Sequence, residues 1–166
     1  MLSKMMAVCV TAAALILVGV APATAGIDGT HQILNRQDPS CLTVFDAKDY
    51  DNADVGVQGC VNAAHQRWTT EALATGGVRL KVGHRGKCLR VQWSGNGYGS
   101  NIVQDDCSVA TPWNIVDFAD GWSRIETARP ASMGAALTMC VDKSNAWDIV
   151  AWGCHNRWWQ QWQSLG

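Results

Sequence analysis

The sequence lacks an excess of charge of either sign. It holds 13 Lys and Arg residues against 14 Asp and Glu residues, so no basic field points to nucleic acid or to an anionic membrane surface. Apart from the N-terminal segment, no apolar run is long enough to span a bilayer. No stretch shows a helical period of useful length. These absences favour a strand-rich protein whose partners are not nucleic acids.

Signatures of catalysis and of metal binding are missing as well. The 4 His residues are scattered, without a His-Glu-x-x-His or Cys-x-x-Cys pair for a metal, and there is no Gly-x-Ser-x-Gly elbow. The Gly-rich stretch at residues 95–99 lacks the Lys and Ser or Thr of a phosphate loop, so we expect a hairpin turn there. Adjacent acids such as Asp105 and Asp106 would face opposite ways on a strand. We therefore expect no catalysis, no cofactor and no metal.

Aromatic side chains are scarce except for one type. The chain has only 2 Phe and 2 Tyr, but it has 9 Trp. An indole ring offers a large apolar face and one N–H donor, so it serves equally to fill a core and to stack on a ligand. The count alone leaves both uses open.

The N-terminus is typical of a secretory signal. Lys4 is followed by an apolar run at residues 5–20 and by the small-x-small site Ala23-Thr24-Ala25, which predicts a signal peptide at 1–25 and a mature domain at 26–166. An uncleaved membrane anchor is the alternative, but the run is short for a span. Cys9 lies inside the apolar run, not directly after it, which argues against a lipoprotein. Six cysteines remain, an even number that favours disulfides in a secreted, extracellular protein.

One pattern occurs three times along the mature chain. Each copy opens with a cysteine, has a second cysteine 19, 19 or 14 positions later, and closes on a tryptophan. A repeat of this length is one supersecondary unit, and its copies bury a shared core together. The expected disulfides, one inside each copy, are Cys41–Cys60, Cys88–Cys107 and Cys140–Cys154. The closing segments are Gln66-Arg67-Trp68, Thr111-Pro112-Trp113 and Gln160-Gln161-Trp162.

Each copy also contains short alternating segments separated by turn formers. Leu42-Thr43-Val44 and Leu89-Arg90-Val91 alternate as half-buried strands do. Other such segments precede each first and each second cysteine, and the closing tryptophan begins a fourth strand. We expect an all-β fold of about twelve strands that closes into one barrel-like unit.

With its Cys-Leu-x-Val openings, second cysteines and Gln-x-Trp closings, the mature chain resembles the ricin B-type lectins. The resemblance implies a β-trefoil of three lobes that binds sugars without catalysis. It implies that Gln66, Trp68, Trp113, Gln160 and Trp162 are structural. It further implies three ligand positions per lobe: an Asp two after the first cysteine, an aromatic residue two before the second, and an Asn three before the closing Trp. A carboxylate accepts strong hydrogen bonds from hydroxyls, and a flat ring covers the C–H face of a sugar.

Two of the three lobes depart from these ligand positions. The first lobe has Thr43, Gln58 and His65, and the second has Arg90, Asp105 and Ala110. We therefore expect both lobes to be structural only.

The third lobe keeps Asp142 and Trp152, while Trp159 stands where the family has Asn. Asn156 is a candidate to replace the missing amide, and Trp147 is a candidate for a second aromatic wall. The expected carbohydrate-binding residues are Asp142, Trp152, Trp159, Gln160, Asn156 and Trp147. On a strand, the adjacent Trp158 and Trp159 would face opposite sides.

The sequence thus predicts a secreted lectin that binds glycans or a polysaccharide, through a terminal galactose-like sugar held in the third lobe. The alternative is a targeting or assembly subunit of a secreted enzyme or toxin that binds protein through exposed tryptophans. A hydrolase in its own right is the third and least supported hypothesis.

Overall fold

The computed structural model describes residues 26–128 and 138–165, in which twelve strands form one sheet system. The predicted signal peptide, residues 1–25, lies outside the described residues. None of the helices in the described ranges has both the length and the apolar character needed to cross a membrane.

Each lobe contributes four strands, as expected. In the first lobe these are β1 (Thr30–Asn35), β2 (Ser40–Val44), β3 (Ala53–Gly59) and β4 (Arg67–Ala72). In the second they are β5 (Val78–Val82), β6 (Cys88–Gln92), β7 (Ser100–Asp105) and β8 (Trp113–Asp117). In the third they are β9 (Ser123–Thr127), β10 (Met139–Lys143), β11 (Ile149–Gly153) and β12 (Trp162–Leu165). Single 3₁₀ turns lie at η1 (Phe45–Ala47), η2 (Ala64–Gln66) and η4 (Trp158–Gln160).

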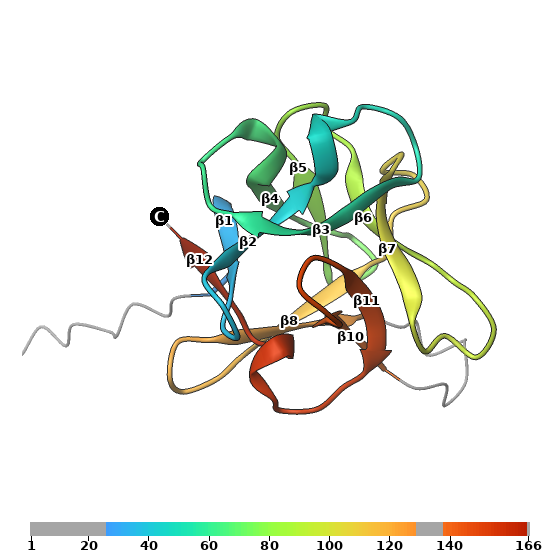
Figure 1. Cartoon of the computed structure of the whole chain (residues 1–166). Helices are drawn as coiled ribbons and strands as arrows, with labels where there is room; N and C mark the ends of the chain where they lie inside the picture. The colour runs from blue at the N-terminus through green and yellow to red at the C-terminus, as the bar shows by residue number, and fades with distance from the viewer. Residues whose placement is uncertain (1–25, 129–137, 166) are drawn as a thin grey trace, which may run out of the picture.

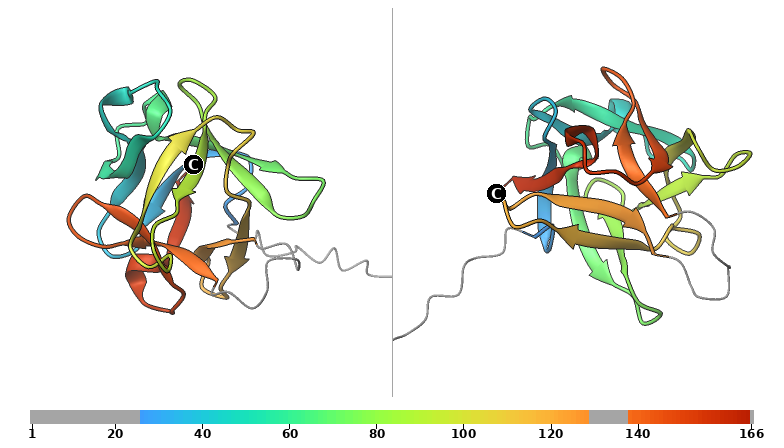
Figure 2. Two further views of the ribbon diagram at one scale, coloured as in Figure 1. Left: turned by 90° about the vertical axis from the view of Figure 1, so that its right-hand side faces the viewer. Right: turned by 90° about the horizontal axis from the view of Figure 1, so that it is seen from below.

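The pairing of the strands defines a β-trefoil. Six strands close a ring in the order β1, β12, β9, β8, β5, β4 and back to β1. The other six form three hairpins, β2–β3, β6–β7 and β10–β11, which contact one another through β7. Each lobe, followed by colour from blue to red, occupies its own sector of the molecule (Figure 1). The right-hand view of Figure 2 shows the β8–β9 pair crossing from the second lobe into the third.

The three closing tryptophans fill the core. Trp68, Trp113 and Trp162 are each at most 1% exposed. The indole N–H of each donates to a main-chain carbonyl in the hairpin of its own lobe: to Leu42 at 2.9 Å, to Leu89 at 3.3 Å and to Val141 at 3.0 Å. The three accepting carbonyls occupy the same position in each repeat, one residue after the first cysteine. The packing and the hydrogen bond together fix each hairpin over the barrel.

All three predicted disulfides are present, and each lies within one lobe. Each bridge ties the first strand of a hairpin to the residue that follows, or nearly follows, the second strand. Closing a loop of 14 or 19 residues restricts the unfolded chain and stabilises the fold by about 3 kcal/mol per bridge in the chain-entropy description.

The buried indole hydrogen bond is expected to contribute to the free energy of unfolding. Trp68→Phe retains an aromatic ring but removes the N–H that Leu42 accepts, so a buried carbonyl loses its partner and the core gains a small void. We expect a loss of about 1–3 kcal/mol in the free energy of unfolding, measured by denaturant titration. Trp147→Phe is the matched control, because Trp147 is 62% exposed and exposed substitutions change stability by about 0.5 kcal/mol or less. Equal losses in both variants would contradict this role.

Candidate functional site

The register of the third hairpin brings Asp142 and Trp152 onto one face. In the β10–β11 pair, Cys140 lies opposite Trp152 and Asp142 lies opposite Val150. Because side chains alternate along a strand, these four share a face, and Val141 and Ala151 point to the other. Ala151 is fully buried in the core, whereas Trp152 is 44% exposed. Val150 and Trp152 therefore lie on the outward face of the hairpin.

A buried glutamine fixes the position of the Asp142 carboxylate. The Gln160 side-chain amide donates to Asp142 Oδ2 at 2.6 Å and to the Gly153 carbonyl at 3.0 Å, while its own oxygen accepts from the His155 N–H at 2.8 Å. Gln160 is completely buried. The structure therefore gives Gln160 a positioning role behind the carboxylate, away from the open face.

The same bonding pattern occurs in the first lobe. There the Gln66 amide donates to Thr43 Oγ1 at 3.0 Å and to the Gly59 carbonyl at 2.9 Å, and its oxygen accepts from the Val61 N–H at 2.8 Å. The network thus belongs to the scaffold. What is special to the third lobe is the carboxylate that it holds.

Asp142 is buried yet retains hydrogen-bonding capacity. Its side chain is only 7% exposed, and its Oδ2 lies 3.2 Å from His155 Nε2. Among the described residues, Oδ1 has no hydrogen-bond donor. Burial raises the pKa of the Asp142 carboxyl above its ordinary value, and the Gln160 amide and the His155 ring offset this only in part. The group is a desolvated acceptor, a feature that is frequent at functional sites.

Trp152 is supported by a residue from the neighbouring lobe. The Tyr98 ring meets it edge-on, with ring centroids 5.2 Å apart and planes at 75°. Tyr98 also covers Gly153, where an added Cβ would lie 3.0 Å from the tyrosine ring. The loop that carries Tyr98 is joined to β11 by the bond from the Gly99 N–H to the Ala151 carbonyl, at 2.9 Å. The expected hairpin turn at residues 95–99 thus also supports the third lobe.

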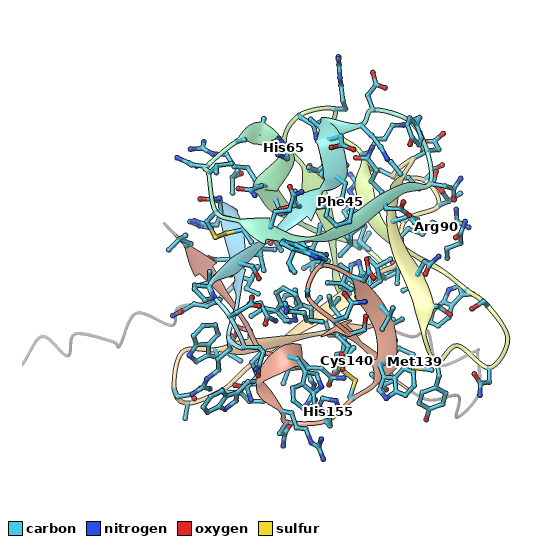
Figure 3. All side chains as sticks on the ribbon, in the orientation of Figure 1. Phe45, His65, Arg90, Met139, Cys140 and His155 are labelled. Carbon is cyan, nitrogen blue, oxygen red and sulfur yellow. A yellow bond between two sulfur atoms is a disulfide. The ribbon has the colours of Figure 1, made fainter. Side chains whose placement is uncertain are left out.

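A chain of contacts runs from Asp142 to two further side chains. The Trp159 indole N–H lies 3.0 Å from His155 Nε2, and the Arg157 guanidinium lies over the Trp159 ring, 5.3 Å from its centroid. His155 Nε2 can donate to Asp142 or accept from Trp159, but it cannot do both through one nitrogen. Figure 3 labels His155 near Cys140 in the third lobe, and His65 and Arg90 in the other two.

These side chains surround one open cavity of about 710 Å³. Asp142, Trp152 and Trp159, which were predicted from the sequence, lie in its wall. Sequence reasoning missed several other lining residues, as well as Tyr98 behind Trp152. The missed lining residues are Gly99, Lys143, Ser144, Val150, His155 and Arg157. His155 and Arg157 could have been suggested by their places shortly after Cys154. No sequence signal links Gly99 to this lobe.

Besides the buried Gln160, two predicted candidates lie outside the cavity wall. Asn156 does not line the cavity, and its side-chain oxygen accepts from Arg124 Nη1 at 3.0 Å. Trp147 lies in the β10–β11 loop outside the cavity wall, and its carbonyl accepts from the Val57 N–H. Trp158 and Trp159 do not lie on a strand, where they would face opposite sides. They occupy the η4 turn, in which Trp158 is exposed and Trp159 is half-buried.

The corresponding positions of the other lobes are occupied by internal contacts. In the second lobe Arg90 and Asp105 form an ion pair with each other. In the first lobe the Thr43 hydroxyl is buried, and it donates to the Cys41 carbonyl while it accepts from Gln66.

Within the described residues, one group brings three potential metal ligands together: Glu126, Cys140 and Cys154. Both of its cysteines are joined in a disulfide, so neither can supply the thiolate that binds a metal. This group therefore does not form a metal site.

Comparison with known proteins identifies the family of this chain. The family model described as ricin-type beta-trefoil lectin domain-like matches residues 20–105, which is more than half of the 166 residues. No curated protein sequence matches the chain. Among solved structures it is similar to a designed three-fold symmetric protein, ThreeFoil, with 23% identity and a TM-score of 0.71 over 84% of this chain and 99% of the other.

Two natural structures show the same likeness. The Rhizoctonia solani agglutinin has 19% identity and a TM-score of 0.70 over 83% of this chain and 94% of its own. An exo-beta-1,3-galactanase from Clostridium thermocellum has 17% identity and a TM-score of 0.68 over 82% of this chain, but only 30% of its own length is covered. These structural likenesses confirm the β-trefoil. Together with the family match, they show that the chain belongs to the ricin-type β-trefoil lectin family, a family of carbohydrate-binding domains.

Proposed function

We propose that this protein is a secreted, non-catalytic lectin that holds a terminal, galactose-like sugar in the cavity of its third lobe. The observation that carries the proposal is the convergence of the Asp142 carboxylate and the Trp152 ring on one open cavity. A sugar needs both an acceptor for its hydroxyls and an apolar surface for its C–H face. The third lobe offers the two on a single face of one hairpin.

Each group has a defined task in this proposal. The Trp152 indole stacks on the apolar face of the sugar ring, held from behind by Tyr98. Asp142 Oδ1 accepts from the sugar hydroxyls, and a charged acceptor makes such bonds stronger than a neutral one does. Gln160 keeps the carboxylate in place. Trp159 and His155 form the side of the cavity beyond the carboxylate.

The other lobes favour a single site per chain. The ion pair of Arg90 with Asp105 and the buried Thr43 hydroxyl leave no counterpart of the third-lobe carboxylate. One shallow site binds a monosaccharide weakly, so useful avidity requires clustered glycans or several copies of the protein.

Secretion is part of the same proposal. Three disulfides are typical of proteins that fold in an oxidising compartment, and the first 25 residues have the composition of a signal peptide.

The exposed tryptophans favour one alternative, a targeting or assembly module. Arg36 lies between Trp122 and Trp158, 5.2 Å and 5.4 Å from the two ring centroids, and Trp158 is exposed. Similar domains form 30% of the galactanase and 17% of a mosquitocidal holotoxin. A secreted catalytic or toxin subunit that co-purifies through this surface, together with absence of any glycan binding, would decide for this alternative.

The two central residues give the first test of the lectin proposal. Asp142→Asn removes a charge-assisted acceptor and Trp152→Ala removes the stacking surface, so each is expected to weaken glycan binding about tenfold or more. Binding is measured on a glycan array and then by calorimetry on the best neutral ligand. Trp147→Ala is the control and is expected to bind as the unchanged protein does. Unchanged binding in both site variants would refute the site.

The burial of Asp142 predicts that the charge proposed to bind the ligand also lowers the stability of the folded state. Its raised pKa means that the folded state disfavours the ionised carboxylate. Between the unfolded pKa, about 3.9, and the higher folded value, the folded state therefore binds more protons, and its stability falls as pH rises through this window. Asp142→Asn keeps an acceptor for Gln160 without the charge. We expect its melting temperature at pH 7 to equal or exceed that of the unchanged protein, with this advantage lost below about pH 4. A large drop in melting temperature at pH 7 would contradict this account.

Tyr98 is expected to act through Trp152. An edge-to-face pair contributes about 0.5–1.5 kcal/mol, so Tyr98→Ala should weaken glycan binding about two- to tenfold, and Tyr98→Phe should restore it. In a Trp152→Ala background, Tyr98→Ala should have no further effect, which a double-mutant cycle measures. Additive losses would instead mean that Tyr98 contributes independently of Trp152.

A further inference from the structure

The wall of the third-lobe cavity contains more basic than acidic residues. Lys143, His155 and Arg157 line it, and Asp142 is the single acidic residue among the described residues of its wall. A neutral sugar requires an acceptor and a stacking surface, but it gives no reason for this concentration of basic groups.

The first lobe serves as an internal control for these positions. From the first cysteine, Lys143 corresponds to Val44. From the second, His155 corresponds to Val61 and Arg157 to Ala63. The closing segments of the two lobes have equal length, and both contain the same buried glutamine network. Because the first lobe folds with uncharged residues at all three positions, the scaffold does not require these basic groups.

The basic residues differ in whether a carboxylate of the protein already pairs with them. Lys143 Nζ lies 2.9 Å from Asp38 Oδ2, and its side chain is only 7% exposed, so its charge is paired. Arg157 is exposed, and in the described part of the chain it has no carboxylate partner. Its guanidinium lies over the Trp159 ring. Its N–H groups are therefore able to donate, and a planar guanidinium binds carboxylate and sulfate-like oxyanions through pairs of hydrogen bonds.

We propose that the cavity takes an acidic glycan, in which a neutral ring lies on Trp152 and Asp142 and an anionic group, carboxylate or sulfate, binds Arg157. This inference rests on the proposed lectin function and specifies its ligand class. The anionic group must lie on the Arg157 side of the ring, because close approach to the Asp142 carboxylate would be repulsive. Trp159 and His155 separate the two charges along the cavity wall, so one ligand can meet both.

The experiment compares three matched galactose-containing oligosaccharides: neutral, sulfated and carrying a uronic acid. Calorimetry at low salt is expected to show about tenfold tighter binding of an acidic ligand than of the neutral one, since hydrogen bonds to charged groups are stronger. The difference should shrink at high salt because the Arg157 contact is exposed. Preference for the sulfate or for the carboxylate alone would support the proposal and identify the group.

Arg157→Gln is the decisive variant. It should lower binding of the acidic ligand to about the level of the neutral one, so that the roughly tenfold ratio between the two affinities falls to about one. Arg157→Lys keeps the charge without the planar fork and should fall between. Arg85→Gln is the control, because Arg85 is exposed in the second lobe and pairs with Asp49.

Two results would overturn the inference, and they differ in what they leave standing. Equal binding of neutral and acidic ligands, still dependent on Asp142, would remove the acidic specificity and keep the lectin function. Absence of binding to all three ligands and to a wider glycan array would overturn the proposed function itself.

Discussion

Each lobe depends on one buried hydrogen bond, from the indole N–H of its closing tryptophan to a main-chain carbonyl of its hairpin. The ring supplies apolar burial, and the bond gives that burial a direction, because a ring shifted along the strand would leave both donor and acceptor unpaired. A hairpin fixed in this way presents the same face outward in every lobe. The scaffold thus presents a corresponding hairpin face in each lobe, whichever side chains that face carries.

On this scaffold the third lobe places a carboxylate where the first has a hydroxyl. Gln66 donates to Thr43 in the first lobe and Gln160 donates to Asp142 in the third, so the same kind of network supports both side chains. The substitution has an energetic cost, since burial disfavours the ionised form of Asp142. A group held charged against this cost gains strength as an acceptor because little water competes for it. The second lobe has Thr111 in place of the glutamine. Arg90 and Asp105, at two of its ligand positions, form an ion pair with each other.

Sequence reasoning succeeded where the determinants lie close together in the repeat. Cysteine spacing predicted the disulfides, and the closing motif predicted the buried Trp68, Trp113 and Trp162, because each lobe repeats the same local geometry. It failed where a contact crosses between lobes or where the backbone leaves the strand. Tyr98 reaches Trp152 through the β7–β11 pairing, which no local pattern encodes. Trp158 and Trp159 lie within the η4 3₁₀ turn, so strand alternation does not describe how their side chains point. The outward orientation of Trp152 needed the register and the burial of Ala151 together.

The contact of Tyr98 with Trp152 also changes what the repeat means for this chain. In a protein of three self-sufficient lobes, any lobe could be exchanged for a copy of another with only local consequences. Here the second lobe, in which Arg90 and Asp105 pair with each other, supplies the support for the ring of the third. A substitution at Tyr98 therefore has consequences outside its own lobe, and the three repeats are not interchangeable, because the ring that the third lobe presents is supported by the second.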